Sequence, residues 1–326
     1  MKKTLFILIA LILALFAFSS CEKRYSEKYW GLFDTVVEVE GYFKNEEEFD
    51  TVKNEVYSLL LFYDELLDAY ENSDMTNLKK VNESGGVPVE VSPELFDFLE
   101  YLKETDKKTK GACNGALGSV TLLWKDAINT ETLPTDKEIE EASRHTDFDT
   151  VILDKSTMTV TLTDPNLRID AGAVAKGYVS KILLSHLDKK DIDGLIINLG
   201  GNVVCIGEKK GEKWSVGIRS PFHDNVYSTV LLSDESLVTS GSYERGAVID
   251  GEYYHHIIDP ETLRPANKHL SVSVRSTDPC VCDVLSTALF VLDVESGKEL
   301  IKNFDNVEVL WIDKNGNGTH TEKFYK

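Results

Sequence analysis

A carboxylate and a hydroxyl are spaced to share one face of a helix in the C-terminal part of the chain. Asp283 and Thr287 are four residues apart in an apolar segment, and residues at i and i+4 lie on the same helix face. Such an oxygen pair suits Mg²⁺, a hard cation that prefers carboxylate, hydroxyl and phosphate oxygens. The alternative interpretation is that Asp283 is only the N-cap of a core helix.

A second segment, residues 168–178, combines small residues with a basic side chain. Residues 171–173 and 175 are all Gly or Ala, and they let a backbone approach a ligand closely where a helix begins. A helix N-terminus favours phosphate through its free N–H groups. Lys176 is placed to reach such a phosphate, and Asp170 to accept hydrogen bonds from a base or ring edge. Small residues at a helix start are also common without any ligand.

Three further segments carry polar side chains. Residues 239–245 combine hydroxyls, a glycine and an arginine, a mixture that binds phosphate oxygens and is also ordinary in loops. His255 and His256 precede an acid, and either is a candidate general base or a structural histidine. Their spacing fits no common zinc motif. Gly200 and Gly201 follow an apolar strand without a dinucleotide-binding fingerprint, as in a simple turn.

Periodicity and capping residues predict the elements that position these groups. Helices are expected from a cap at Asn45 to about Tyr70, from Ser92 to Gly111, from Thr135, from Gly172 to about His186, and over 283–292. Strands are expected at 33–43, 87–91, 151–153, 158–162, 195–199, 214–219, 226–232, 271–275 and 307–312. Helices gather in the first half and strands in the second, which favours an α+β fold. We expect one compact domain, with mostly antiparallel sheets and packed helices, and two lobes as an option.

Composition narrows the function classes. The 326 residues are 42% hydrophobic, enough for a sizeable core, and carry a net charge of −20. This charge argues against a nucleic-acid-binding surface, which needs clustered Lys and Arg. It is compatible with a local basic pocket for one phosphorylated small molecule.

The N-terminal residues predict a targeting signal. Lys2 and Lys3 precede an apolar run over 5–18, shorter than the roughly twenty residues that span a bilayer. Ser19, Ser20 and Cys21 resemble the lipobox of bacterial lipoproteins. We expect a signal peptide at 1–20, a lipidated Cys21 with a tether to 28, and the folded domain at 29–326. The protein would then be lipid-anchored outside the cytoplasmic membrane; an ordinary cleaved signal is the alternative.

Taken together and in this order, the motifs resemble those of the FAD:protein FMN transferase family, the ApbE flavin-transferring lipoproteins. The resemblance covers about Phe33 to Leu292. The family motifs correspond to Asp170–Tyr178, Asn198–Asn202, Thr239–Arg245, His256–Thr262 and Cys282–Ala288. The sequence departs from the family pattern at Phe33-Asp34-Thr35, Cys113-Asn114, Leu263 and Cys282, positions that affect the pocket walls rather than the metal pair.

The resemblance implies a Mg²⁺-dependent enzyme that transfers FMN from FAD to a Thr hydroxyl of an acceptor protein and releases AMP. It assigns the metal to Asp283, Thr287, the Ala173 carbonyl and an assisting Ser286, and His256 is the candidate base. Residues implied to contact FAD are Phe33, Tyr70, Ala112, Cys113, Asn114, Asp170, Lys176, Gly200, Gly201, Ser240, Arg245 and Ile257.

Two alternatives share much of this site. An FAD pyrophosphatase would use water in place of Thr and give free FMN and AMP, and a covalent FMN adduct on an acceptor would distinguish the two. A flavin-binding lipoprotein without turnover would need no metal, which the Asp283–Thr287 pair argues against. The expected acceptors are electron-transport subunits or FMN-binding domains.

Overall fold

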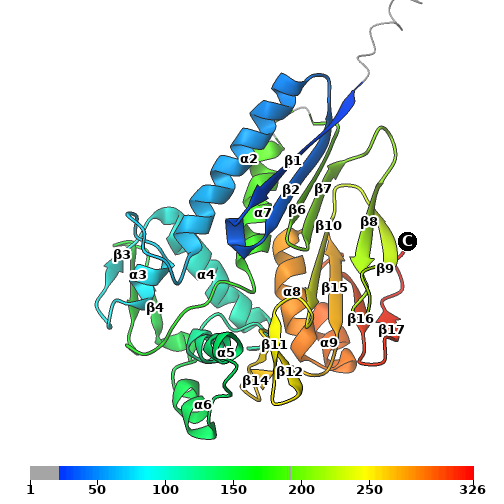
Figure 1. The fold of residues 1–326 in the computed structure, drawn as a ribbon. Coiled ribbons are helices and arrows are strands. Elements are labelled where there is room, and N and C mark those ends of the chain that lie inside the picture. Colours follow the sequence, from blue (N-terminus) through cyan, green and yellow to red (C-terminus); the bar gives the residue numbers. More distant parts are fainter. Residues whose placement is uncertain (1–21, 189, 191) are drawn as a thin grey trace, which may run out of the picture.

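The structure is a computed structural model and describes residues 22–188, 190 and 192–326. A long antiparallel sheet forms its centre. In the described part of the chain eight strands pair in the order β1-β2-β6-β7-β10-β15-β16-β17 (Figure 1). Their bounds are β1 (Lys23–Trp30), β2 (Val36–Phe43), β6 (Gly194–Leu199), β7 (Asn202–Gly207), β10 (Ser236–Gly241), β15 (Ser271–Ser276), β16 (Glu308–Ile312) and β17 (Gly318–His320). Every residue of β15 is buried, which places the core at the middle of the sheet.

Helices α2 (Glu46–Leu67), α7 (Ala175–Leu187) and α8 (Pro279–Val291) pack against this sheet, followed by α9 (Val294–Ile301). Helix α2 begins at the predicted cap, because the Asn45 side chain accepts the Glu48 N–H. Its inward face contains Phe49, Val52, Val56, Leu60, Tyr63, Leu66 and Leu67. The hairpin of β8 (Trp214–Arg219) and β9 (Val226–Leu232) encloses a second apolar cluster around Trp214 and Phe324.

A smaller lobe contains the chain between α2 and α7. The sheet β3-β5-β4 packs with helices α3 and α4, while α5 and α6 lie beside it (Figure 1). The bounds are α3 (Leu78–Asn82), β3 (Val89–Glu90), α4 (Pro93–Lys108), α5 (Gly118–Thr130), α6 (Asp136–Ser143), β4 (Val151–Asp154) and β5 (Thr159–Leu162). The helix predicted from Thr135 is confirmed and begins with a capping box between Thr135 and Glu138. The strands predicted at 151–153 and 158–162 are confirmed and pair as the β4–β5 hairpin. The mixed helix and antiparallel-sheet fold is therefore the expected one.

The segment expected to be a tether is instead part of the sheet. Residues 23–30 form β1, which pairs along its whole length with β2. The prediction was wrong because it considered the charges of this segment and not the alternation of exposed and half-buried residues along it. Tyr25 and Tyr29 lie on the half-buried side of the strand, where Tyr25 stacks on Phe49 and Tyr29 packs on Tyr57. Cys21 and the predicted signal peptide lie outside the described residues.

Two helices that border the expected site begin elsewhere than predicted. Helix α8 starts at Pro279, four residues before Asp283, with Asp278 as its N-cap. Helix α7 starts at Ala175, because residues 171–174 form a tight turn in which Ala175 N–H donates to Ala171 O. Strands β7 and β10 and helices α5 and α9 were not predicted. Residues 313–317 form the turn of the β16–β17 hairpin, in which Asp313 accepts the Asn315 and Asn317 N–H groups.

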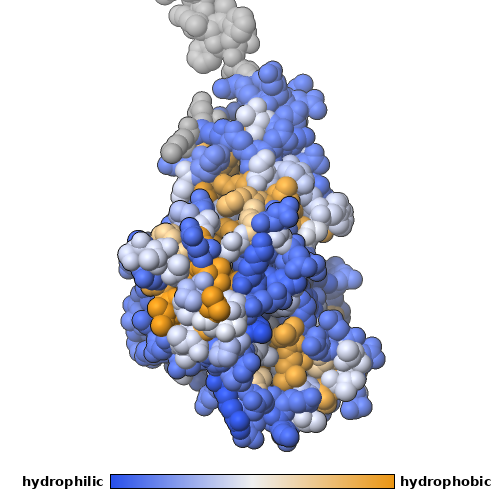
Figure 2. Space-filling view, turned by 90° about the vertical axis from the view of Figure 1, so that its left-hand side faces the viewer, coloured by the Kyte–Doolittle hydropathy of each residue, from blue (hydrophilic) through white to orange (hydrophobic). Residues whose placement is uncertain are grey.

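The face of the molecule that includes α2 is mainly hydrophilic, with separate apolar areas near its middle (Figure 2). Tyr57, Leu61 and Phe62 are exposed apolar side chains on α2. Among the described residues we find no helix long and apolar enough to cross a membrane.

Candidate functional site

A buried carboxylate lies at the junction of α7 and α8. Asp283 is 4% exposed and occupies the second turn of α8, where nearly every neighbouring residue is buried. The cap of this helix is Asp278, whose side chain accepts the Cys280 N–H. The N-cap interpretation of Asp283 is therefore wrong. Burying an ionised group is costly unless something pairs with it, so the carboxylate calls for another explanation.

The N-terminus of α7 faces this carboxylate. Asp283 Oδ2 accepts the Gly177 N–H at 2.7 Å, and Val174, the N-cap of α7, makes no side-chain cap. Asp283 thus caps α7 from another helix, in the partial positive field of its N-terminus. Burial raises the pKa of Asp283, and the charge of Lys176 opposes this rise. A Cβ on Gly177 would lie 2.4 Å from Asp283 Cβ, so only glycine allows this approach.

Three hydroxyls meet at the next turn of α8. Ser240 Oγ on β10 is 2.8 Å from Ser286 Oγ and 3.5 Å from Thr287 Oγ1. Ser286 Oγ also donates to Asp283 O, so its hydroxyl is already engaged within α8. Thr287 is only partly buried, which leaves its hydroxyl the more available of the two. The predicted metal residues of α8 therefore come together, and Ser240, predicted to contact FAD, lies with them.

The donor set fits a hard cation. In the part of the chain that the structure describes, Asp283 Oδ2 accepts the Gly177 N–H. No hydrogen bond of normal geometry reaches Oδ1, although the Asn202 amide lies nearby, so an oxygen of the carboxylate is left for another ligand. Neither sulfur nor imidazole contributes, and no group of three or more His, Cys, Asp or Glu gathers among the described residues. One carboxylate with hydroxyls and carbonyl oxygens is a set that Mg²⁺ accepts, provided phosphate or water completes it.

Asn202, which opens β7, is a further polar side chain at this junction. It is fully buried, accepts a hydrogen bond from Ser180 Oγ at 3.1 Å, and lies next to the Asp283 carboxylate. Its amide nitrogen Nδ2 has no partner of hydrogen-bonding geometry among the described residues. Asn202 belongs to the 198–202 motif, but nothing in the sequence indicated which member of the motif would face the metal residues.

The candidate base has a defined tautomer. His256 Nδ1 lies 3.1 Å from Arg245 O. Because a carbonyl only accepts, Nδ1 carries the proton and Nε2 is free to accept one. Desolvation lowers the pKa of His256, and the positive charges of Arg245 and Lys176 act in the same direction. The ring keeps an exposed edge, so a neutral, accessible base is present at neutral pH.

Aromatic and charged side chains border the same region on the side of the lobe. Tyr70 lies against Asp170, and burial followed by the Asp170 charge raises the pKa of this tyrosine. Lys125 Nζ, a residue not predicted to take part, sits 3.4 Å from the centre of the Tyr70 ring. Phe33 has a left-handed backbone (φ 51°) and donates its N–H to Asp64.

The other residues predicted to contact the flavin differ in burial and in the hydrogen bonds that they already make. The Asn114 side chain bonds Thr146 O and Ala116 N–H, so it holds its own loop. Cys113 and Ile257 are buried, and Ala112 is partly buried. A Cβ on Gly200 would lie 2.2 Å from Thr35 Oγ1, and Gly201 has φ 91°, a conformation that favours glycine. Arg245 Nη2 donates to Asp34 O at the rim.

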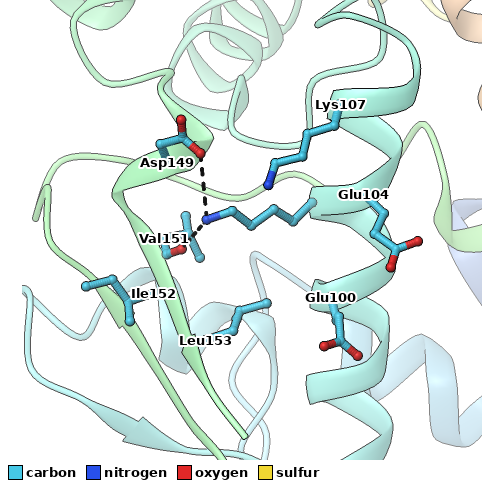
Figure 3. Close-up of a pocket in the computed structure, with 8 residues that line it drawn as sticks. Glu100, Glu104, Lys107, Asp149, Val151, Ile152 and Leu153 are labelled. Atoms are coloured by element: carbon cyan, nitrogen blue, oxygen red, sulfur yellow. Dashed lines mark hydrogen bonds and ion pairs between the residues drawn. The ribbon is translucent and has the colours of Figure 1, made fainter.

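A separate open pocket lies in the smaller lobe. It has a volume of about 410 Å³ and lies between α4 and β4 (Figure 3). Lys103 Nζ crosses it to donate to Val151 O at 2.7 Å and to pair with Asp149 at 4.0 Å. These contacts join α4 to β4, and the pocket contains none of the predicted site residues.

Comparison with known proteins identifies the family of this chain. Residues 33–311 match the model of the ApbE family. A Klebsiella pneumoniae protein named FAD:protein FMN transferase is 32% identical, over 82% of this chain and 83% of its own. One of that name from Treponema pallidum is 36% identical, over 79% and 76%. The crystal structure of the ApbE protein of Thermotoga maritima superposes with a TM-score of 0.81 at 28% identity, covering 93% of this chain and 98% of that one. The chain therefore belongs to the ApbE family.

Proposed function

We propose that this protein transfers FMN from FAD to a threonine hydroxyl of an acceptor protein, with Mg²⁺ as cofactor and AMP as the other product. The observation that carries the proposal is the buried Asp283 carboxylate, held beside hydroxyls and the N-terminus of α7. The name shared by the curated relatives supports the same reaction. In balance, the threonine Oγ–phosphorus bond forms, the pyrophosphate bond breaks, and AMP leaves.

Asp283, Thr287 and the Ala173 carbonyl would hold the metal, with Ser286 assisting. When bound, Mg²⁺ offsets negative charge on the phosphorus under attack and on the leaving phosphate. Lys176 and the N–H groups of α7 add a fixed positive potential for the same phosphates. This potential needs no rearrangement, because the Gly177–Asp283 hydrogen bond already fixes the position of α7.

Proton transfer falls to His256. Its Nδ1 proton is held by Arg245 O, so Nε2 accepts the threonine proton as the hydroxyl attacks. The lowered pKa of His256 keeps the ring neutral at neutral pH. Tyr70, Asp170 and Phe33 would hold the flavin, with the remaining predicted contacts around them. The flavin takes no part in redox chemistry during this transfer.

Hydrolysis of FAD is the second candidate reaction. The exposed edge of His256 would let water reach Nε2 as readily as a threonine side chain. The two reactions share the metal residues and differ only in the nucleophile. An acceptor protein is therefore essential to any test.

The test incubates residues 22–326 with FAD, Mg²⁺ and a flavin-acceptor domain, and follows acceptor mass, AMP and free FMN. A gain of one FMN that disappears when the acceptor threonine is changed supports the transferase. AMP and free FMN with an unmodified acceptor support the pyrophosphatase. Asp283→Ala should abolish both reactions in a folded protein. The matched control is Asp278→Ala, which removes a carboxylate from the cap of the same helix and should retain transfer.

We also propose that Cys21 is lipidated and anchors the protein outside the cytoplasmic membrane. The support is the sequence pattern of residues 1–21. Partition of the full-length chain into detergent, and its loss in Cys21→Ala, would test this localisation. A Cys21→Ala protein that still partitions into detergent would contradict it.

A further inference from the structure

Asn202 and Ser180 lie between the elements that carry the proposed metal residues. Ser180 is on α7, three residues after Gly177, so both face the same side of that helix. Gly177 donates to Asp283 Oδ2 from this side, and Ser180 Oγ donates to Asn202 Oδ1. Asn202 in turn lies next to the Asp283 carboxylate. Three elements, α7, β7 and α8, thus meet around one carboxylate.

The direction of the Ser180 hydrogen bond orients the Asn202 amide. Because Ser180 donates to the amide oxygen, both N–H groups of Asn202 point away from Ser180. They remain without a hydrogen-bond partner among the described residues, although Asn202 and Ser180 are both fully buried. Leaving a buried amide unpaired is costly, because the group has lost its hydrogen bonds to water. A fold carries such a group where a function requires it.

We propose that Asn202 is a positioning residue for the metal ligand Asp283, and that Ser180 sets its orientation. An Asn202 N–H is the donor that would fix the rotation of the carboxylate from the β7 side once the metal is bound, while the Gly177 N–H already fixes it from the α7 side. This inference rests on the proposed metal site, and it assigns Asn202 no contact with substrate.

Partners that orient a metal ligand contribute to affinity even though they do not touch the metal. Their loss typically weakens metal binding 10- to 100-fold. Asn202→Leu keeps the branched shape of the side chain and removes its donors, so we expect Mg²⁺ affinity to fall at least tenfold. Ser180→Ala frees the amide to rotate, so its effect should have the same direction and a smaller size.

The experiment measures Mg²⁺ affinity by calorimetry and by the rise in melting temperature, with and without FAD, in residues 22–326. Wild type, Asn202→Leu, Ser180→Ala and the double variant form one cycle. The control is Ser236→Ala, because Ser236 is also a fully buried serine in this sheet and its Oγ has no partner in the described chain. The control should bind Mg²⁺ like the wild type.

The cycle separates the possible outcomes. The proposal expects a double variant no weaker than Asn202→Leu, because Ser180 acts only through Asn202. A folded Asn202→Leu protein with Mg²⁺ affinity within twofold of the wild type would overturn it. If Asn202→Leu does not fold, an unchanged affinity in Ser180→Ala overturns it equally. A wild type that binds no Mg²⁺ in either condition would instead refute the metal site in the proposed function.

Discussion

Replacing Asp283 by Asn should stabilise the metal-free protein while it removes activity. The Asn side chain keeps an oxygen for the Gly177 N–H, so that hydrogen bond survives in neutral form. Hydrogen bonds to charged groups contribute about 1.5–3 kcal/mol against 0.5–1.5 for neutral ones, a loss of about 1 kcal/mol. Removing a buried charge relieves a desolvation cost of several kcal/mol. We therefore expect Asp283→Asn to raise the free energy of unfolding by about 1–3 kcal/mol without metal.

The effect has a defined pH dependence. Burial raises the pKa of Asp283 above its ordinary value of 3.8, against the opposing charge of Lys176. The folded wild type therefore binds this proton more tightly than the unfolded chain. Its free energy of unfolding falls as the pH rises from 3.8, the pKa in the unfolded chain, through the raised pKa of the folded state. Consequently the advantage of Asp283→Asn is complete above the raised pKa and shrinks as the pH falls towards 3.8.

The assay is urea unfolding of both proteins, first in EDTA and then in Mg²⁺. A bound metal at 100 times its dissociation constant adds about 2.7 kcal/mol to the wild type and should add little to the variant, so the order of stability reverses. Asp278→Asn is the control, since Asn also caps helices and should change neither curve much. The reasoning is refuted if Asp283→Asn is the less stable protein in EDTA.

Three other substitutions test separate parts of the fold. Gly177→Ala would place a Cβ 2.4 Å from Asp283 Cβ. We expect the free energy of unfolding to fall by about 1–3 kcal/mol and transfer activity to be lost. A variant that unfolds in urea like the wild type would contradict the close approach. Arg275 is 7% exposed and pairs through two nitrogens with Glu235. Arg275→Ala should lower the free energy of unfolding in urea by about 3 kcal/mol, and Arg275→Lys should lower it less. Equal losses in the two variants would show that the two-nitrogen geometry contributes nothing. His255 Nδ1 accepts the Ile257 N–H while Nε2 donates to a carbonyl, and burial lowers its pKa; stability should therefore fall as pH drops below about 6.5, by at most about 1.4 kcal/mol per pH unit from this group, and His255→Gln should show a smaller slope in unfolding measured from pH 7.5 to 5.

Local signals in the sequence predicted the elements that have them. Asn45, Ser92 and Thr135 each cap a helix as expected, because capping acts within three residues. Helix α5 was missed since its cap position is Leu117, which makes no side-chain cap. The start of α8 was missed although Asp278 followed by Pro279 is a recognisable cap and first turn.

The site was predictable only as far as it depends on one helix. Spacing alone placed Asp283 and Thr287 on a common face, and the structure brings Ser240 to them from β10. The contact of Gly177 with Asp283 joins residues 106 apart in the chain, and no local pattern indicates it. Asn202 and Lys125 could not be predicted from the sequence for the same reason, because packing between distant elements determines their partners.

Strand β1 sets a distance as well as completing a sheet. It begins at Lys23, so only Glu22 separates it from Cys21. Its eight residues span about 26 Å at 3.3 Å per residue. The strand ends three residues before Phe33, at the end of the sheet where Gly200 and Asn202 also lie. If Cys21 carries lipid as proposed, the strand acts as a rigid spacer with almost no slack at its base. The acceptor threonine would then have to be presented within reach of a site whose height above the bilayer is limited by the length of one strand.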